Sequence, residues 1–457
     1  IVLPNGPEMA AAFLAIAQSA AAAPLNPAYR LDEFIFHLED LQAKALVLPA
    51  GYDGPALEAA RRRGLILLRL DFDPAGPAGD FTLSAEAAAG LAEAADVGPE
   101  DVALLLHTSG TTSRPKLVPL LQRNIVASAR NIGAALALGP ADRCLNVMPL
   151  FHIHGLVGAV CASLASGGSV WCAPGFDTLR FFGWLEAARP TWYSAAPTMH
   201  QAILVRAPRS AAAIAGARLR LIRSSSAPLP PQVMTALREV FGAPVVDSYG
   251  MTEAAHQMAS NPLPPSAQKP GSVGVAAGPE VRVAHEGEDR LLATGATGEV
   301  VISGPNVTPG YGAAPEANAR AFFEAEGRRW FRTGDQGAFD AEGYLSLSGR
   351  LKEIINRGGE KVSPLEVDGV LMDHPAVAQA VTFAAPHPRL GEEVAAAVVL
   401  REGASATEQD IRAFAAGRLA AFKVPRKLLI MSDIPKGATG KLQRIGLAMK
   451  LGLVAGA

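Results

Sequence analysis

Residues 104–120 read LLLHTSGTTSRPKLVPL, an apolar run followed by small, hydroxylated and basic residues. The longer segment DVALLLHTSG (101–110) predicts a buried strand that ends abruptly in small and hydroxylated residues, with Lys116 after them. Backbone N–H groups, hydroxyls and a lysine after a strand can hold a phosphate, although an ordinary polar loop has the same composition. The segment is not a kinase-type P-loop, because no second glycine separates Gly110 from Lys116 and Leu117 occupies the Ser/Thr position.

Buried strands and helices alternate through the first 250 or so residues. Helices are predicted in segments such as GLVGAVCASLASGG (155–168) and PPQVMTALREVF (230–241). Between them lie apolar runs that end in small or polar residues: AKALVLPAG (43–51), LILLRLDFD (65–73), DRCLNVMP (142–149), SVWCAP (169–174), TWYSAAP (191–197), LRLIRSSSAP (219–228) and PVVDSYGMTE (244–253). This alternation predicts an α/β fold with parallel-rich sheets flanked by helices, and we expect the polar strand ends to converge on one ligand site.

The pattern changes twice further along the chain. GEVVISGPNVTPGY (298–311) and WFRTGDQGAFDAEGYLSLSGR (330–350) predict short strands of a small antiparallel, β-barrel-like part. After GRLKEIINRGGEKVSP (349–364), two helical patterns and a strand pair predict a small, mobile α+β domain. We therefore place a large N-terminal domain at residues 1–350 and a C-terminal domain at residues 351–457. Residues 73–100 are predicted to form a linking loop with a short helix.

Composition narrows the classes of partner. A formal net charge of −2 and a pI of about 6.6 favour neither nucleic acid nor an acidic membrane surface. No apolar run is long enough for a membrane-spanning helix, and the three cysteines form no CxxC pair, so we expect a cytoplasmic monomer or homodimer without structural zinc. The start of the chain predicts a core strand, a turn at residues 4–6 and a helix from Pro7, so we expect further residues upstream.

Four more segments carry residues suited to nucleotide chemistry. DSYGMTEAAHQ (247–257) contains Thr252, which can bond a phosphate oxygen, and Glu253, which can hold Mg²⁺ beside it. Asp335 lies between glycines in FRTGDQG (331–337), where a carboxylate can bind a ribose diol, and Arg350 can join it. Lys441 lies in the glycine-containing segment PKGATGKLQR (435–444), from which its ammonium group can be delivered to a site.

These five segments, in this order, resemble the adenylate-forming superfamily of acyl-CoA synthetases, luciferases and peptide-synthetase adenylation domains. The resemblance covers essentially the whole chain, but not the first few tens of residues usual in that superfamily. It implies an AMP-forming acid–thiol ligase that uses ATP, Mg²⁺ and coenzyme A, with small molecules as its partners. A carboxylate would first attack the α-phosphorus of ATP, and a thiol would then attack the acyl-adenylate.

The resemblance also implies a role for each matching residue. The pyrophosphate loop matches Thr108, Ser109, Gly110, Thr111, Thr112 and Lys116, although Ser113 and Leu117 replace glycines that are common there. The adenine pocket matches Ser226, Ala227, Asp247, Ser248, Tyr249 and Gly250, and the phosphate and magnesium residues match Thr252 and Glu253. The ribose contacts match Asp335 and Arg350, the hinge Lys352, the coenzyme A loop Gly358 and Gly359, and the adenylation lysine Lys441.

Polar residues near the expected carboxyl-activation point suggest a short acid. MPLFHIHG (148–155) contains His152 and His154, LIRSSSAP (221–228) contains Arg223 and three serines, and His256 follows Glu253 closely. These side chains could donate hydrogen bonds to a second carboxylate, whereas a fatty acid needs a long apolar tunnel. Within the superfamily the chain most resembles the oxalate–CoA ligases, in the segments HTSGTTSRPK (107–116), MPLFHIHG (148–155), YGMTEAAHQMASNPLPP (249–265) and KPGSVG (269–274). That likeness implies that Ser226 and His256 contact the far carboxylate of oxalate, with His152 nearby.

Several alternatives stay open at this point. His152 and His256 could instead serve in packing or contact adenine. The same chemistry could act on malonate, a medium-chain fatty acid or an aryl acid, or on an amino acid, for which Phe176-Asp177 is a weak signature. A non-catalytic nucleotide-binding or scaffold protein is the alternative of another class. The presence of Lys441, Glu253 and Lys116 argues against it.

Overall fold

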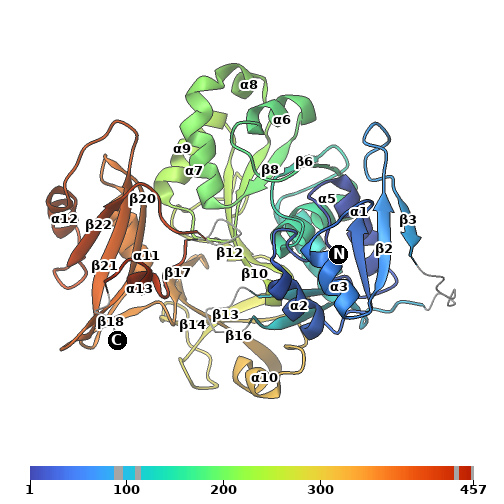
Figure 1. Ribbon diagram of the computed structural model, residues 1–457. Helices are drawn as coiled ribbons and strands as arrows, with labels where there is room; N and C mark the ends of the chain where they lie inside the picture. Colours follow the sequence, from blue (N-terminus) through green and yellow to red (C-terminus); the bar gives the residue numbers. More distant parts are fainter. Residues whose placement is uncertain (87–95, 109–114, 437–441, 454–457) are drawn as a thin grey trace.

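The computed structural model describes residues 1–86, 96–108, 115–436 and 442–453. In Figure 1 the N-terminal elements lie on the right, a central sheet with its helices in the middle and at the top, and an antiparallel part below. The elements after residue 350 form a separate C-terminal domain at the left of that view. The mixed α/β class, the parallel-rich sheets and the small antiparallel part are as predicted.

The first 86 residues build a three-stranded sheet with three helices. The helices are α1 (Pro7–Ala17), α2 (Leu31–Asp40) and α3 (Pro55–Arg62), and the sheet has the order β1 (Ala45–Pro49), β2 (Ile66–Asp71), β3 (Thr82–Ala85). Pro7 occupies the first turn of α1, as predicted, because that position needs no backbone donor. Residues 1–3 form no strand, although the Val2 N–H donates to the Val47 carbonyl at 3.0 Å. The strand β3 was not predicted, and residues 87–95, within the predicted linker and helix, lie outside the described residues.

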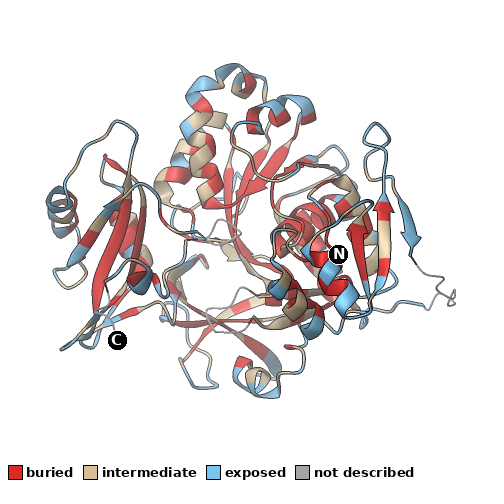
Figure 2. Cartoon of the chain, in the orientation of Figure 1, coloured by how far each residue is buried: buried red, intermediate tan, exposed pale blue. Residues whose placement is uncertain are grey.

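A seven-stranded sheet forms the centre of the molecule. Its order is β12 (Val275–Ala276), β11 (His256–Ser260), β10 (Val245–Met251), β9 (Leu221–Ser224), β8 (Trp192–Ala195), β6 (Arg143–Asn146), β7 (Ser169–Cys172). The five strands from β10 to β7 are parallel, β11 pairs antiparallel with β10, and β12 pairs antiparallel with β11. Every residue of β8 and β9 is buried (Figure 2), as expected for strands covered on both faces.

Helices cover both faces of this sheet (Figure 1). They are α4 (Gln122–Ala135), the π-helix η1 (His154–Cys161), α5 (Ala162–Ala165), α6 (Phe181–Ala188), α7 (Pro197–Arg206), α8 (Ala211–Gly216) and α9 (Pro231–Phe241), with short 3₁₀ turns η2 (Ala207–Arg209) and η3 (Thr252–Ala254). The helix predicted over residues 155–168 is therefore two consecutive segments, a π-helix and an α-helix. A π-helix is rare and occurs mostly near functional sites.

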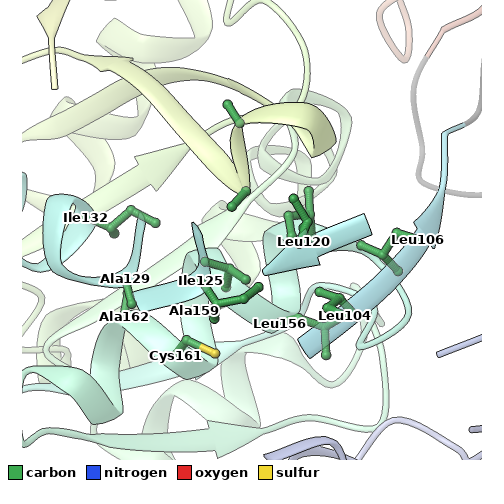
Figure 3. Close-up of a cluster of buried hydrophobic side chains, with 14 of the residues drawn as sticks. Leu104, Leu106, Leu120, Ile125, Ala129, Ile132, Leu156, Ala159, Cys161 and Ala162 are labelled. Atoms are coloured by element: carbon green, nitrogen blue, oxygen red, sulfur yellow. The ribbon is translucent and has the colours of Figure 1, made fainter. Parts of the chain in front are cut away.

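The strand predicted within residues 101–110 does not join the parallel sheet. β4 (Val102–His107) pairs antiparallel with β5 (Leu117–Leu121), and the Thr108 N–H donates to the Lys116 carbonyl at 2.9 Å. The prediction of a parallel strand was wrong here, because a buried apolar run does not encode the direction of its neighbour. Leu104, Leu106 and Leu120 pack instead against apolar residues of α4 and η1 (Figure 3).

The antiparallel part and the C-terminal domain complete the chain. The antiparallel sheet has the order β13 (Glu280–Ala284), β14 (Gly298–Ser303), β16 (Arg328–Phe339), β15 (Phe322–Ala325), with β17 (Leu345–Arg350) on β16 and α10 (Pro315–Ala321) beside it. The C-terminal sheet has the order β19 (Glu360–Val362), β18 (Ile355–Arg357), β21 (Gly391–Leu400), β20 (Val377–His387), with β22 (Lys427–Met431) on β21. Its helices are α11 (Pro364–Met372), α12 (Glu408–Ala416) and α13 (Leu447–Lys450). Within the described residues, no helix has the length and apolar character needed to cross a membrane.

Candidate active site

A pocket of about 760 Å³ lies beyond the carboxyl ends of the parallel strands β8, β9 and β10. Strands in an open parallel sheet all present these ends at one edge, which is where such folds bind ligands. The pocket is lined by these residues that were predicted from the sequence to bind ATP or AMP: Ser226, Ala227, Asp247, Ser248, Tyr249, Gly250, Asp335 and Arg350. Residues far apart in the sequence thus meet at one site.

An aspartate and an arginine occupy one wall of this pocket. Asp335 on β16 and Arg350 on β17 are register partners, and Arg350 Nε lies 3.3 Å from Asp335 Oδ1. The Tyr249 hydroxyl donates a hydrogen bond to Asp335 Oδ2. The carboxylate of Asp335 raises the pKa of the Arg350 guanidinium, and Tyr249 and Glu253 add to this effect. The wall therefore presents fixed acceptors and donors, which suit a diol.

The opposite wall is a tight turn held by serines. Ser226 follows β9 with φ of 79°, a conformation that costs a non-glycine residue free energy and is common at functional sites. The Ser225 hydroxyl donates to the Ser248 carbonyl at 2.9 Å, and the Ser248 hydroxyl donates to the Ser224 carbonyl at 3.0 Å. Burial raises the pKa of the Asp247 carboxyl well above its usual range. These bonds join the ends of β9 and β10 and fix the shape of the wall.

The residues predicted to handle phosphate form a second group. The Tyr311 hydroxyl donates to Glu253 Oε1 at 2.8 Å, and Lys116 Nζ lies 4.3 Å from the centre of the Tyr311 ring. Burial lowers the pKa of Lys116, whereas the Glu253 carboxylate raises it and Lys352 lowers it further. Thr252 begins the short turn η3 that carries Glu253. An ammonium group, a carboxylate and the hinge candidate Lys352 thus interact in one region.

The donor set can be tested for Mg²⁺. Among the residues the structure describes, no group of three or more His, Cys, Asp or Glu side chains could hold a metal. Mg²⁺ in nucleotide sites is commonly bound by one or two carboxylates together with substrate phosphates. Glu253, a buried carboxylate beside Lys116, fits that arrangement and would share the ion with ATP.

Two histidines and an arginine adjoin the Ser226 turn. His154 Nδ1 lies 2.9 Å from Ser226 Oγ, and its Nε2 lies 2.6 Å from Ser194 Oγ. Its ring packs edge-on against His256, with 4.9 Å between ring centres. Arg223 Nη1 lies 3.5 Å from His256 Nε2. We call His154, Arg223, Ser226 and His256 the acid-end cluster, and all but Ser226 are almost fully buried.

The backbone around this cluster has little free space. His256 itself has φ of 106°, and a Cβ built on Gly158 of η1 would lie 2.6 Å from its Cδ2 and Nε2. Glycine at position 158 therefore lets the π-helix approach the imidazole. The cluster includes the predicted residues Ser226 and His256. His152 instead accepts a hydrogen bond at Nδ1 from the His154 N–H at 3.2 Å, and its contact with an acid stays a prediction.

Arg223 and His154 belong to the acid-end cluster but were not predicted individually to contact the acid. The sequence indicated only that Arg223, at a strand end, and His154, in the HxH pattern, are among the side chains that could donate hydrogen bonds to a second carboxylate. A charged residue inside an otherwise apolar run, LIRS, was the signal for Arg223, because a buried strand rarely contains a cation without a function or a partner. Nothing in HIH alone decides which imidazole faces the turn.

The residues predicted to form the hinge and to approach coenzyme A lie in or near the C-terminal domain. Lys352 follows β17, and Gly358 and Gly359, with φ of 61° and 99°, form the turn between β18 and β19. Positive φ at both turn positions explains the two glycines. Ser109, Gly110, Thr111, Thr112 and Lys441 lie outside the described residues. Leu442 and Arg444, which follow Lys441, line the nucleotide pocket.

Comparison with known protein families agrees with this geometry. Residues 1–312 match the AMP-binding enzyme family, and residues 366–441 match the AMP-binding enzyme C-terminal domain. The chain belongs to the AMP-binding enzyme family. It is an AMP-forming acid–CoA ligase, with ATP and coenzyme A as the substrates that this family implies.

Individual members of the AMP-binding enzyme family resemble the chain over nearly its whole length. An oxalate–CoA ligase from Arabidopsis thaliana is 46% identical over 97% of this chain and 86% of its own length. An oxalate–CoA ligase from Saccharomyces cerevisiae is 41% identical over 97% of this chain and 85% of its own length. The crystal structure of ATP-bound MatB from Rhodopseudomonas palustris superposes with a TM-score of 0.83 at 30% identity, covering 95% of this chain and 85% of MatB.

Proposed function

We propose that this ligase activates oxalate, forming an oxalyl-adenylate from ATP and then oxalyl-CoA, with release of pyrophosphate and AMP. The observation that carries the proposal is the acid-end cluster, which lies directly against the Ser226 turn of the nucleotide pocket. Ser226 belongs to both, so an acid held by the cluster would present its reacting carboxylate to the α-phosphate. The high identity to two oxalate–CoA ligases supports the same acid.

The charge of the cluster favours a short dicarboxylate over a fatty acid. Arg223 is fully buried, and burial lowers its pKa to about 10, so it stays protonated at neutral pH. A buried guanidinium is costly unless anions or hydrogen-bond acceptors compensate it. A second carboxylate could accept hydrogen bonds from Arg223 and His256, whereas an alkyl tail would leave these groups facing carbon.

The first half-reaction follows from this placement. A carboxylate oxygen of oxalate attacks the α-phosphorus, the bond to the β-phosphate oxygen breaks, and pyrophosphate leaves. Lys116, Thr252 and Lys441 would stabilise the negative charge that develops on the phosphoryl oxygens. Glu253 would hold Mg²⁺, which shields the charge of the leaving pyrophosphate. Asp335 and Arg350 would fix the ribose, with adenine between the Ser226 turn and Tyr249.

The second half-reaction needs a different set of groups. The coenzyme A thiolate attacks the oxalyl carbonyl carbon, and AMP leaves with the electron pair of the broken mixed-anhydride bond. We propose that the C-terminal domain, residues 351–457, turns about Lys352 between the steps. This turn would withdraw Lys441 and bring Gly358 and Gly359 to the pantetheine arm.

Isotope transfer tests the proposed intermediate directly. Oxalate labelled with ¹⁸O in its carboxylates, incubated with enzyme, ATP and coenzyme A, should place one ¹⁸O atom in each AMP formed. The thioester should have the mass of oxalyl-CoA. Unlabelled AMP, or label in phosphate instead, would contradict an adenylate route. Faster thioester formation from octanoate or 4-coumarate than from oxalate and malonate would reject the short-diacid assignment.

A further inference from the structure

Arg444 connects three parts of the C-terminal domain. Its Nη2 lies 2.8 Å from Asp368 Oδ2 on α11, and its Nη1 donates to the Thr382 carbonyl on β20 at 3.0 Å. Its Nε lies 3.5 Å from Glu353 Oε2. The side chains of Arg444, Glu353 and Asp368 are only 12%, 19% and 12% exposed, so these are mostly buried ion pairs.

Glu353 occupies a special place in this network, because it immediately follows the hinge candidate Lys352. Its backbone N–H donates to the Arg350 carbonyl at 2.8 Å, and its side chain lines the nucleotide pocket. Burial raises the pKa of the Glu353 carboxyl, and the Arg444 and Arg350 cations offset only part of this rise. Glu353 therefore lies between a nucleotide-pocket arginine and an arginine from the end of the chain.

Arg444 also follows Lys441 by three residues. Leu442, between them, forms an antiparallel bridge with Lys436 and lines the same pocket. The contact of Arg444 with Glu353 thus limits the position of residues 442–444, which directly follow Lys441 in the chain. Only the adenylation step uses Lys441 in the proposed function, so only that step needs this restraint.

We propose that the Glu353–Arg444 ion pair is a strut between the hinge and the segment after Lys441, and that it positions this segment for adenylation. Both residues are positioning residues: they act through Lys441 and not on the reacting atoms. The inference rests on the proposed two-step function. It predicts that loss of the strut slows adenylation selectively, because a misplacement of about 1 Å at a catalytic group can cost up to about 100-fold in rate.

Two substitutions separate this role from a general contribution to stability. Glu353→Gln keeps the shape of the side chain and removes the charge that pairs with Arg444, while Arg444 keeps Asp368 and the Thr382 carbonyl. Asp142→Asn is the control, because it neutralises a mostly buried carboxylate in another ion pair, that of Asp142 with Arg220 in the large domain. Neither Asp142 nor Arg220 belongs to the network of Arg444.

The experiment measures the two half-reactions of each protein separately. Adenylation is followed as acid-dependent ATP–pyrophosphate exchange. Thioester formation is followed by letting the adenylate accumulate on the enzyme and then mixing it rapidly with coenzyme A. Glu353→Gln should lower the ratio of the adenylation rate to the thioester rate about tenfold relative to wild type. Asp142→Asn should keep the wild-type ratio, even if its melting temperature falls.

The outcomes of this experiment bear on the two proposals differently. An unchanged ratio in Glu353→Gln, or an equal loss in both variants, overturns the strut. Wild-type exchange that is faster with octanoate or 4-coumarate than with oxalate contradicts the proposed substrate, while the ratio measured with that acid still tests the strut. Circular dichroism and thermal melting confirm that each variant is folded before rates are compared.

Discussion

At the scale of single residues, the proposed selection of the acid depends most on Arg223. It is fully buried, it donates to Gln257 Oε1 at 3.1 Å, and its other amino group faces His256. A charge-assisted hydrogen bond to a carboxylate contributes about 1.5–3 kcal/mol. Arg223 therefore has enough binding energy available to distinguish a diacid from a monoacid.

Replacing this arginine should change selectivity more than it changes folding. Arg223→Met keeps the length of the side chain and removes the charge, and kcat/KM for oxalate should fall about 100-fold, the equivalent of a charge-assisted contact. A monocarboxylate should lose far less. Arg220→Met is the control. Arg220 directly precedes β9, so it lies at the end of the strand away from the acid-end cluster, where its side chain pairs with Asp142. If Arg223→Met lowers kcat/KM equally for a diacid and a monoacid, the second carboxylate of the diacid does not bind at Arg223.

The convergence of strand ends could be predicted from the sequence, whereas the direction of single side chains could not. Ser226, which follows β9, lines one pocket with Arg350 at the end of β17 and with Asp335, the register partner of Arg350 within β16. The choice between His152 and His154 depends on the direction of side chains at the start of η1. A π-helix changes that direction relative to an α-helix, and the sequence HIH does not announce one.

At the scale of secondary-structure elements, α2 is fastened to the end of β4 by two histidines and an aspartate. His37 Nδ1 lies 3.2 Å from His107 Nδ1, and His107 Nε2 lies 2.7 Å from Asp40 Oδ2. The His37 ring also stacks on Tyr29. Because His107 precedes Thr108, this contact holds the strand end from which the predicted pyrophosphate loop begins.

This contact predicts a pH dependence of stability. Burial and the neighbouring His107 lower the pKa of His37 from 6.5 to about 4, although Glu33 and Asp40 oppose the shift. As the pH falls, His37 is therefore protonated in the unfolded chain before it is protonated in the folded one. The contribution of neutral His37 to the free energy of unfolding is complete above about pH 6.5 and is lost as the pH falls towards 4. Between pH 7 and pH 5, urea unfolding should show a loss of about 1–2 kcal/mol attributable to this group, after allowance for solvent screening.

His37→Asn provides the comparison for that measurement. The asparagine amide can still donate to His107 Nδ1 but does not titrate, so the variant should lose less stability than wild type over the same pH interval. The same pH slope in both proteins would show that another group titrates. Activity at pH 7 serves as a check that the end of β4 keeps its position.

Predictions of elements were most successful where helices and strands alternate. The parallel strands β6 to β10 and helices such as α9 follow the predicted segments, because continuous apolar runs and helical periodicity are local signals. The antiparallel partner of β4 was missed because strand direction depends on where the chain returns. The exposed strand β3 was missed because none of its residues is buried, which leaves no apolar pattern.

At the scale of the whole molecule, contacts between the large part and the C-terminal domain define one arrangement. Gln232 on α9 donates to the Gly369 carbonyl on α11 at 3.4 Å and also contacts Asp373. Lys361 Nζ, beside the Gly358–Gly359 turn, lies 3.0 Å from Glu286 Oε2. These few polar contacts lie far apart in sequence, so no local pattern could predict the orientation they stabilise. Such an interface is compatible with movement.

Domain alternation can be examined through the adenylation lysine. Lys441→Ala should abolish adenylation and leave thioester formation from a preformed acyl-adenylate largely intact, because the thiol step does not need this ammonium group. The two steps are measured on separate samples, one with ATP and acid, the other with the adenylate and coenzyme A. An equal loss of adenylation and of thioester formation would argue against a C-terminal domain that turns between the two steps.

We propose that strand ends of the large domain bind ATP while the acid-end cluster binds a short diacid, so that an acyl-adenylate forms between them. The most direct measurement is ATP–pyrophosphate exchange without coenzyme A, across oxalate, malonate, octanoate and 4-coumarate. Exchange should depend on the acid, be fastest with oxalate and need no thiol. Exchange that requires coenzyme A, or that is faster with octanoate or 4-coumarate than with oxalate, would rule out an adenylate formed from a short diacid at this site.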